Sequence, residues 1–154
     1  MLAAVVALGS GIFSPRLRTW AEMPGGAIAF MRANRLHGNV LNNLDWGEYL
    51  IWHLTPQSRV FIDGRYDLVY PDNLIRDYLG FLFGWPGGEK LLDHYPHDLV
   101  LVVPYSGAYR FTTADKRWKM VYRDRAAALF VPSGNKIRPQ VHAATDNTLD
   151  WSFP

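Results

Sequence analysis

The chain has 154 residues, of which 49% are hydrophobic and 19% are charged, which fits one domain of ordinary size and excludes a disordered chain. Its formal net charge is only +2 and its basic residues are scattered, so it lacks the electrostatic footprint of a nucleic-acid-binding protein. It has no cysteine, which excludes disulfides, zinc–thiolate sites and a cysteine nucleophile.

The first segment, Met1 to Phe13, is almost free of polar groups and carries no charge. It is shorter than the roughly 20 apolar residues that span a bilayer. It also lacks the basic start and the small-residue cleavage site of a signal peptide. We interpret residues 1–19 as the end of a transmembrane helix and its linker. The alternative is a short apolar helix or strand packed on the domain. Arg16 and Arg18 follow, and the positive-inside tendency would place such a flank in the cytoplasm.

Residues 20–132 are interpreted as one soluble α/β domain. Apolar periodicity and turn residues predict, in chain order, a helix from the Pro24-Gly25-Gly26 break to Leu36, a strand at 39–42, a helix at 46–54, a strand at 59–63, a helix at 71–83, a short helix at 89–94, a strand at 98–103, a short helix within 105–114, and strands at 118–123 and 126–131. We expect a mostly parallel sheet flanked by helices, with a C-terminal antiparallel hairpin. Residues 133–154 are polar and are predicted to form a flexible tail.

The helix at 46–54 has a clear stripe. Trp46, Tyr49, Leu50 and His53 fall at i, i+3, i+4 and i+7 and therefore share one helical face. His53 is interpreted as a hydrogen-bonded core or interface histidine. Among the aromatic residues, Trp85 lies in a Gly/Pro-rich loop and is the best candidate for an exposed side chain that stacks on a sugar or docks on a membrane interface.

The most informative segment for function runs from Phe61 to Arg65. Asp63, Gly64 and Arg65 stand at the carboxyl end of a predicted strand, where open α/β sheets bind their ligands. Arg65 could grip a phosphate or carboxylate with two hydrogen bonds while Asp63 holds its geometry. The alternative, which we favour on turn chemistry, is an Asp-Gly turn with a local ion pair to Asp67.

No metal or cofactor is predicted. The acids at 63, 67, 72 and 77 match no calcium loop, and Asp72 suits the start of a helix. His94 and His97 bracket a proline that prevents their alignment on one helix, and no third ligand stands nearby. The sequence also lacks a P-loop, a G-x-G-x-x-G and a G-x-S-x-G motif, so no complete catalytic set is visible.

A longer pattern carries a resemblance to a known family. It consists of an Asn, then Trp-Gly-x-Tyr-Leu, a Pro, an Asp-Gly-Arg strand end, and a later Trp-x-x-x-Tyr-x-Asp strand. In this chain these residues are Asn42, Trp46-Gly47, Tyr49-Leu50, Pro56, Asp63-Gly64-Arg65, Trp118, Tyr122 and Asp124. The chain thereby resembles the C-terminal soluble domain of bacterial multi-pass GT-C-type membrane glycosyltransferases, including family-39-like relatives. A fainter similarity extends to oligosaccharyltransferase catalytic subunits, whose Trp-Trp-Asp-Tyr-Gly motif is incomplete here.

The resemblance covers about residues 24–132 and implies a function. It implies a non-catalytic domain on the extracytoplasmic (periplasmic) side, since the family's catalytic carboxylates lie upstream between membrane helices. The implied partners are the membrane, the upstream transmembrane region of the parent protein and a polyprenyl-phosphate sugar. The domain would support the binding of that lipid-linked sugar or of the acceptor. Trp46, Tyr49, Asp63 and Arg65 are the predicted site residues, in structural support or substrate contact. The alternative is a free-standing soluble α/β small-ligand-binding protein or enzyme with its site at the Asp63-Gly64-Arg65 strand end.

Overall fold

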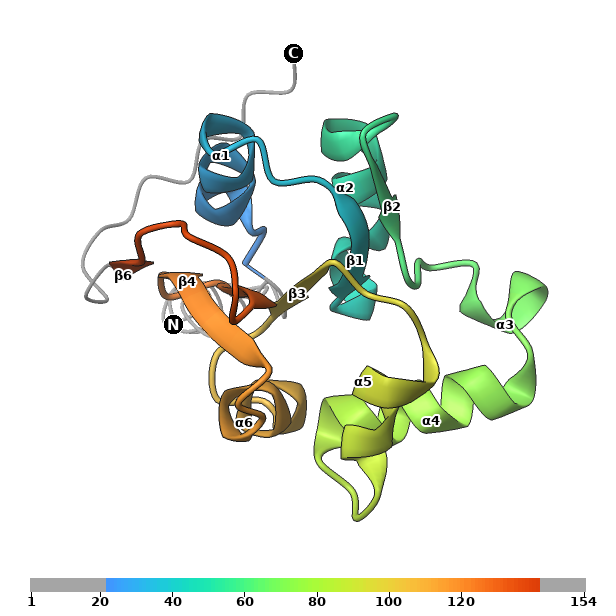
Figure 1. The fold of residues 1–154 in the computed structure, drawn as a ribbon. Coiled ribbons are helices and arrows are strands. Elements are labelled where there is room, and N and C mark those ends of the chain that lie inside the picture. Colours follow the sequence, from blue (N-terminus) through green and yellow to red (C-terminus); the bar gives the residue numbers. More distant parts are fainter. Residues whose placement is uncertain (1–21, 142–154) are drawn as a thin grey trace, which may run out of the picture.

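A computed structural model of the protein describes residues 22–141, except for the side chains of Tyr66 and Asp67, and contains one six-stranded sheet (Figure 1). The strand order is β2-β1-β3-β5-β4-β6, and the strands are β1 (Gly38–Asn42), β2 (Ser58–Val60), β3 (Leu99–Val102), β4 (Trp118–Arg123), β5 (Ala128–Pro132) and β6 (Gln140–Val141). β1 is parallel to β2 and β3, and β6 is parallel to β4, whereas β5 is antiparallel to β3 and β4. The predicted α/β fold with a C-terminal antiparallel hairpin is confirmed.

Helices cover both faces of this sheet. They are α1 (Gly25–Ala33), α2 (Gly47–Leu54) preceded by the 3-10 turn η1 (Leu44–Trp46), α3 (Tyr66–Val69), α4 (Asp72–Phe83), the 3-10 turn η2 (Gly88–Lys90), α5 (Leu91–His94) and α6 (Gly107–Ala114). In Figure 1, α1 and α2 lie on one side of the sheet, and α4, α5 and α6 lie on the other. No helix between residues 22 and 141 combines the length and apolarity needed to cross a membrane.

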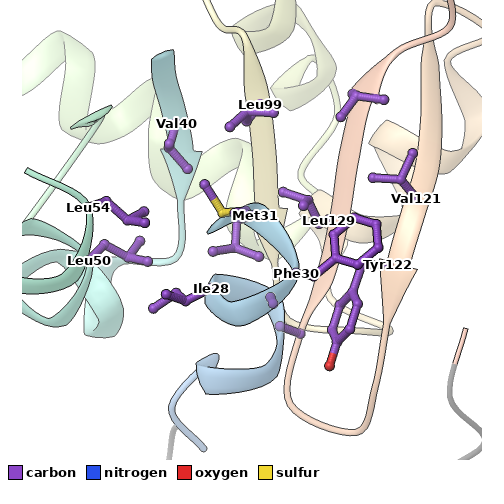
Figure 2. Packing of buried hydrophobic residues seen from close by; sticks show 14 of the residues in the cluster. Ile28, Phe30, Met31, Val40, Leu50, Leu54, Leu99, Val121, Tyr122 and Leu129 are labelled. Atoms are coloured by element: carbon purple, nitrogen blue, oxygen red, sulfur yellow. The ribbon is translucent and has the colours of Figure 1, made fainter. Parts of the chain in front are cut away.

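The alternation of side chains along the strands divides the core into two clusters. Figure 2 shows the first, in which residues of α1 and α2 such as Met31 and Leu50 pack on Val40, Leu99 and Leu129. The second joins the opposite face of the strands to Tyr78 and Phe81 of α4, Leu91 and Leu92 of α5 and Ala108 of α6. All four residues of β3 are buried, as expected for a continuous apolar strand covered on both faces.

Several boundaries differ from the predicted ones. The first helix ends at Ala33 rather than Leu36, because Arg35 takes up a left-handed conformation with φ of 53°. β2 stops at Val60 instead of reaching residue 63. The four-residue helix α3 and the two-residue strand β6 are not predicted from the sequence; β6 falls within the segment predicted as a tail. The predicted membrane segment at 1–19 and the tail beyond 141 lie outside the described residues.

The strand directions bring one end of most strands together. β4 runs in the same direction as β3, since both are antiparallel to β5. β3 is parallel to β1, and β1 is parallel to β2. The four strands therefore finish on one side of the molecule, which we call the carboxyl end of the sheet. Helices α2 and α6 begin there, and so does α1, because Gly26 lies against the Tyr122 hydroxyl and Asp124. Figure 2 shows the Tyr122 side chain beside α1.

Candidate functional site at the carboxyl end of the sheet

The Asp63–Arg65 pair forms the centre of the candidate site. The Arg65 Nε donates to Asp63 Oδ1 over 3.0 Å, and its Nη2 donates to Oδ2 over 2.6 Å. The Arg65 backbone N–H donates to Oδ1 over 3.0 Å and the Tyr70 hydroxyl to Oδ2 over 3.2 Å. The Asp63 side chain is only 2% exposed, while that of Arg65 is 63% exposed. A buried carboxylate therefore fixes one side of the guanidinium and leaves the other side open to solvent.

This geometry keeps both groups charged. The hydrogen bonds from Arg65 lower the pKa of Asp63 from 3.8 to about 2, against the opposing effect of burial. Asp63 in turn raises the pKa of Arg65. Burial, reinforced by the Asp63 charge, raises the pKa of the Tyr70 hydroxyl, which therefore remains a proton donor. Both groups are therefore ionised at neutral pH, and the site presents to solvent a guanidinium whose charge is balanced by Asp63.

Helix α2 holds the turn that carries this pair. A side chain at Gly47 would place its Cβ only 2.4 Å from Asp63 Cα, so the first residue of α2 packs directly on the Asp63 backbone. The next residue, Glu48, accepts a 2.6 Å hydrogen bond from the Gly64 N–H. The Trp-Gly-Glu and Asp-Gly-Arg segments, which are separate in the sequence, therefore form one contact.

Asn42 supports the same turn from the end of β1. Its buried Oδ1 accepts hydrogen bonds from the N–H groups of Phe61 (2.9 Å) and Ile62 (3.3 Å), and its Nδ2 donates to Ile62 O (2.8 Å). The Phe61 N–H also donates to Val40 O over 2.9 Å, so the amide adds to the β1–β2 pairing and bonds the chain just beyond the last residue of β2. The Tyr78 hydroxyl completes the network by donating to Asn42 O (3.2 Å) and accepting from Leu44 N–H (2.7 Å).

The predicted residues Trp46 and Tyr49 occupy structural positions beside α1. Trp46 is fully buried, and its indole N–H donates to Glu22 O over 3.1 Å. Tyr49 is half-buried, and its ring meets that of His53 edge-on at a centroid distance of 4.3 Å. His53 is half-buried; Arg32 Nη2 lies 3.5 Å from its ring Nδ1 and donates to its carbonyl over 2.7 Å. Neither Trp46 nor Tyr49 contributes one of the hydrogen bonds to the Asp63 carboxylate described above.

Several residues of this site are not predicted from the sequence. Their hydrogen-bond partners are distant in the sequence: 16 residues separate Glu48 from Gly64, and 7 separate Tyr70 from Asp63. Tyr78 is 34 residues from Leu44, whose N–H donates to it beside Asn42. Asn42 had a signal in the sequence, because it is part of the motif that carries the family resemblance. Among residues 22–141, no three histidine, aspartate or glutamate side chains are placed to hold a metal ion.

Comparison of the chain with family models, curated proteins and solved structures found no match. The resemblance to GT-C-type glycosyltransferases therefore rests on the motif residues themselves. The structure adds that the motif residues Asn42, Gly47, Asp63 and Arg65 meet at one place in the fold.

Proposed function

We propose that this chain supplies the extracytoplasmic C-terminal domain of a multi-pass membrane protein resembling polyprenyl-phosphate-sugar glycosyltransferases. In this proposal the domain is not catalytic and supports the binding of the acceptor or of the lipid-linked sugar. The observation that carries the proposal is the exposed, pre-oriented guanidinium of Arg65 at the carboxyl end of the sheet.

Arg65 suits a phosphate ligand. Its Nε and Nη2 are committed to Asp63, so the Nη1 side remains available for a planar, charge-assisted interaction with phosphate oxygens. Because Asp63 already fixes the side chain, little rotamer freedom is lost when a ligand binds. A polyprenyl-phosphate sugar offers such an anion next to its sugar.

Asp63 is unsuited to proton transfer. Its pKa of about 2 lies far from the neutral range in which a general base works best, and its oxygens already accept four hydrogen bonds. The chemistry of the pair is therefore binding, which agrees with a domain that assists a catalytic centre elsewhere in the parent protein.

The proposal is tested by reading the open frame upstream of the Met1 codon and assaying the parent protein in membranes. We expect Arg65→Ala to raise KM for the polyprenyl-phosphate sugar on the order of tenfold, the loss of about one charge-assisted hydrogen bond. Arg117→Ala is the matched control, because Arg117 is 62% exposed and pairs with Asp115 in the same i, i+2 arrangement. Equal KM values for the wild type and Arg65→Ala would contradict the proposal.

A second candidate function is a free-standing small-ligand-binding protein. It is favoured by the place of the site, since open α/β sheets bind ligands outside the carboxyl ends of their strands, and the Asp63–Arg65 turn follows the carboxyl end of β2. A stop codon directly upstream of Met1, together with calorimetric binding of inorganic phosphate that Arg65→Ala abolishes, would favour this function over the first.

A further inference from the structure

The exposed apolar side chains of this protein are distributed unevenly. Among the described residues, nine large apolar side chains are exposed: Met23, Ile51, Trp52, Leu68, Val69, Phe83, Trp85, Tyr105 and Val141. All but Ile51 and Trp52 belong to segments at the carboxyl end of the sheet. This segregation is the observation from which the inference proceeds.

The first group lies beside the candidate site. Leu68 and Val69 are in α3, which begins directly after Arg65 at the end of the β2 segment. Leu68 is 81% exposed, and Val69 is also exposed. The N–H groups of both residues donate to the Arg65 carbonyl, so two exposed apolar residues share one turn with Arg65.

The second group surrounds the start of α6. Phe83 and Trp85 flank Gly84, whose backbone packs against Gly107, the first residue of α6. Their rings lie 5.9 Å apart, and Trp85 is 50% exposed, as its loop position predicts. Tyr105, in the segment that leads from β3 into α6, is 77% exposed.

Arg123 links this second group to the end of β4. Its guanidinium stacks over the Tyr105 ring at 4.7 Å, and its backbone pairs in register with Val141 of β6. Val141 and Tyr105 therefore both lie beside the last residue of β4, at the carboxyl end.

The opposite end of the sheet has a different surface. The segments that lead into β1, β3 and β4 there contain exposed charged or titratable residues, including Arg35, His37, Asp98, Lys116 and Arg117. None of the nine exposed apolar side chains found between residues 22 and 141 lies in these segments. Exposed charged residues such as Glu48 and Arg65 also occur at the carboxyl end, so the two ends differ in their large exposed apolar side chains and not in their charges. Ile51 and Trp52, in α2, are the two that lie outside the carboxyl end.

The chain also enters the domain at the carboxyl end. Met23 precedes the start of α1, and Glu22 forms an ion pair with Arg125 in the turn that follows β4. Eight residues separate Phe13, the last residue of the apolar run, from Glu22. Such a length of chain reaches at most about 30 Å. An apolar run inserted in a bilayer would therefore keep this end of the domain near the lipid surface.

From this we infer that the carboxyl end of the sheet lies on the lipid–water interface of the bilayer, with its exposed apolar side chains in the headgroup region. Tyrosine and tryptophan favour that region because they have an apolar body and a polar tip. Arg65, between Asp63 and Leu68, then lies at the depth of lipid phosphates, where a polyprenyl-phosphate headgroup is also found. The inference takes its membrane context from the proposed function and adds the orientation.

The absence of cysteine allows a direct test in the full chain. Single cysteines replace exposed residues at the carboxyl end (Leu68→Cys, Trp85→Cys and Tyr105→Cys) and at the opposite end (His37→Cys and Lys116→Cys). Each carries an environment-sensitive fluorophore. The chains are reconstituted in vesicles of phosphatidylcholine and phosphatidylglycerol that contain a lipid with a nitroxide-labelled headgroup. We expect the probes at 68, 85 and 105 to shift to the blue and to lose most of their emission, and those at 37 and 116 to be unaffected.

The other outcomes overturn the inference in distinguishable ways. Equal quenching at both ends, or quenching at neither end in chains that float with the vesicles, would reject the orientation and leave the membrane context intact. Failure to float with vesicles would reject the membrane context as well. Blue-shifted emission at 68, 85 and 105 without lipid would show that the protein itself, and not a bilayer, covers this surface.

Discussion

At the scale of single residues, the two Asp-x-Arg pairs of this protein have the same geometry, but burial of the aspartate gives them different contributions to stability. Arg65 and Arg117 are equally exposed and each binds the aspartate two positions earlier with two side-chain nitrogens. Asp115 is partly open to water, whereas Asp63 is almost completely buried. An exposed ion pair contributes little to stability, but a buried carboxylate depends on its partner.

We expect stability to depend on pH through Asp63. Its pKa is lower in the folded chain than the ordinary 3.8, so its contribution is complete above about pH 5 and is lost as the pH falls toward 2. The size of this loss is about 2 kcal/mol. Urea unfolding between pH 5 and pH 2 measures it, with Asp63→Asn expected to lose correspondingly less over this range. Parallel pH curves for the two proteins would show that Asp63 does not carry this dependence.

A second prediction at this scale concerns Asn42. Asn42→Ala removes the amide that binds residues 61 and 62. It leaves the buried Ile62 N–H without this acceptor, while the Phe61 N–H keeps its bond to Val40 O, so we expect the free energy of unfolding to fall by about 2 kcal/mol. Asn39→Ala on the same strand is the control, because the bonds of Asn39 described in the structure involve only its backbone. Chemical denaturation compares the two. A loss at Asn42 no greater than at Asn39 would contradict the role assigned to the amide.

At the scale of elements, we expect a glycine-to-alanine change at the start of α2 to destabilise the protein, although alanine has the higher helix propensity. Replacing glycine by alanine within a helix usually stabilises it by up to about 1 kcal/mol. At Gly47 the added Cβ would lie 2.4 Å from Asp63 Cα, a backbone atom that moves only with the Asp63 turn. We therefore expect Gly47→Ala to lower the melting temperature clearly, while Gly134→Ala, where a Cβ meets no atom within 4 Å, leaves it nearly unchanged. Calorimetry decides between these effects.

The sequence predicts most elements because their signals are local. Pro71 and Asp72 mark the start of α4, and Thr55-Pro56 marks the end of α2, in agreement with the structure. The end of β2 is not a local signal, because the β1–β2 register ends at Val60 and the next residues bond the side chain of Asn42 on another strand. The strand β6 has only two residues, too few for any periodicity, and is defined by its pairing with β4.

The same reasoning explains how much of the site could be predicted. Asp63 and Arg65 are near neighbours in the sequence, so their interaction follows from turn geometry and a strand end. Glu48 and Tyr78 act through contacts that exist only once α2 and α4 have packed on the sheet. Trp46 belongs to the same motif, but its burial against Glu22 follows from the packing of α1 and could not be predicted from helical periodicity.

At the scale of the whole molecule, one end of the sheet concentrates the features that matter for function. It holds the fixed guanidinium of Arg65, the starts of α1, α2 and α6, and the exposed aromatic side chains around Trp85. The two core clusters fill the space between helices and sheet, so this end is free to serve as a surface without weakening the core.

The interpretation of residues 1–19 as the end of a membrane helix and its linker leads to the last prediction. Within the part of the chain that the structure describes, both core clusters draw their members from residues between Ala27 and Ile137. We expect removal of residues 1–19 to leave the melting temperature nearly unchanged and to make the protein more soluble, as measured by calorimetry and size-exclusion chromatography. Removing residues 1–24 is the informative contrast, because it also deletes Glu22, which accepts from Trp46 and pairs with Arg125. That chain should melt several degrees lower, since about 1 kcal/mol shifts the midpoint by a few degrees in a domain of this size. If removal of residues 1–19 unfolds the domain, the apolar run belongs to the fold and packs on it, and the interpretation of that run as the end of a membrane helix is wrong.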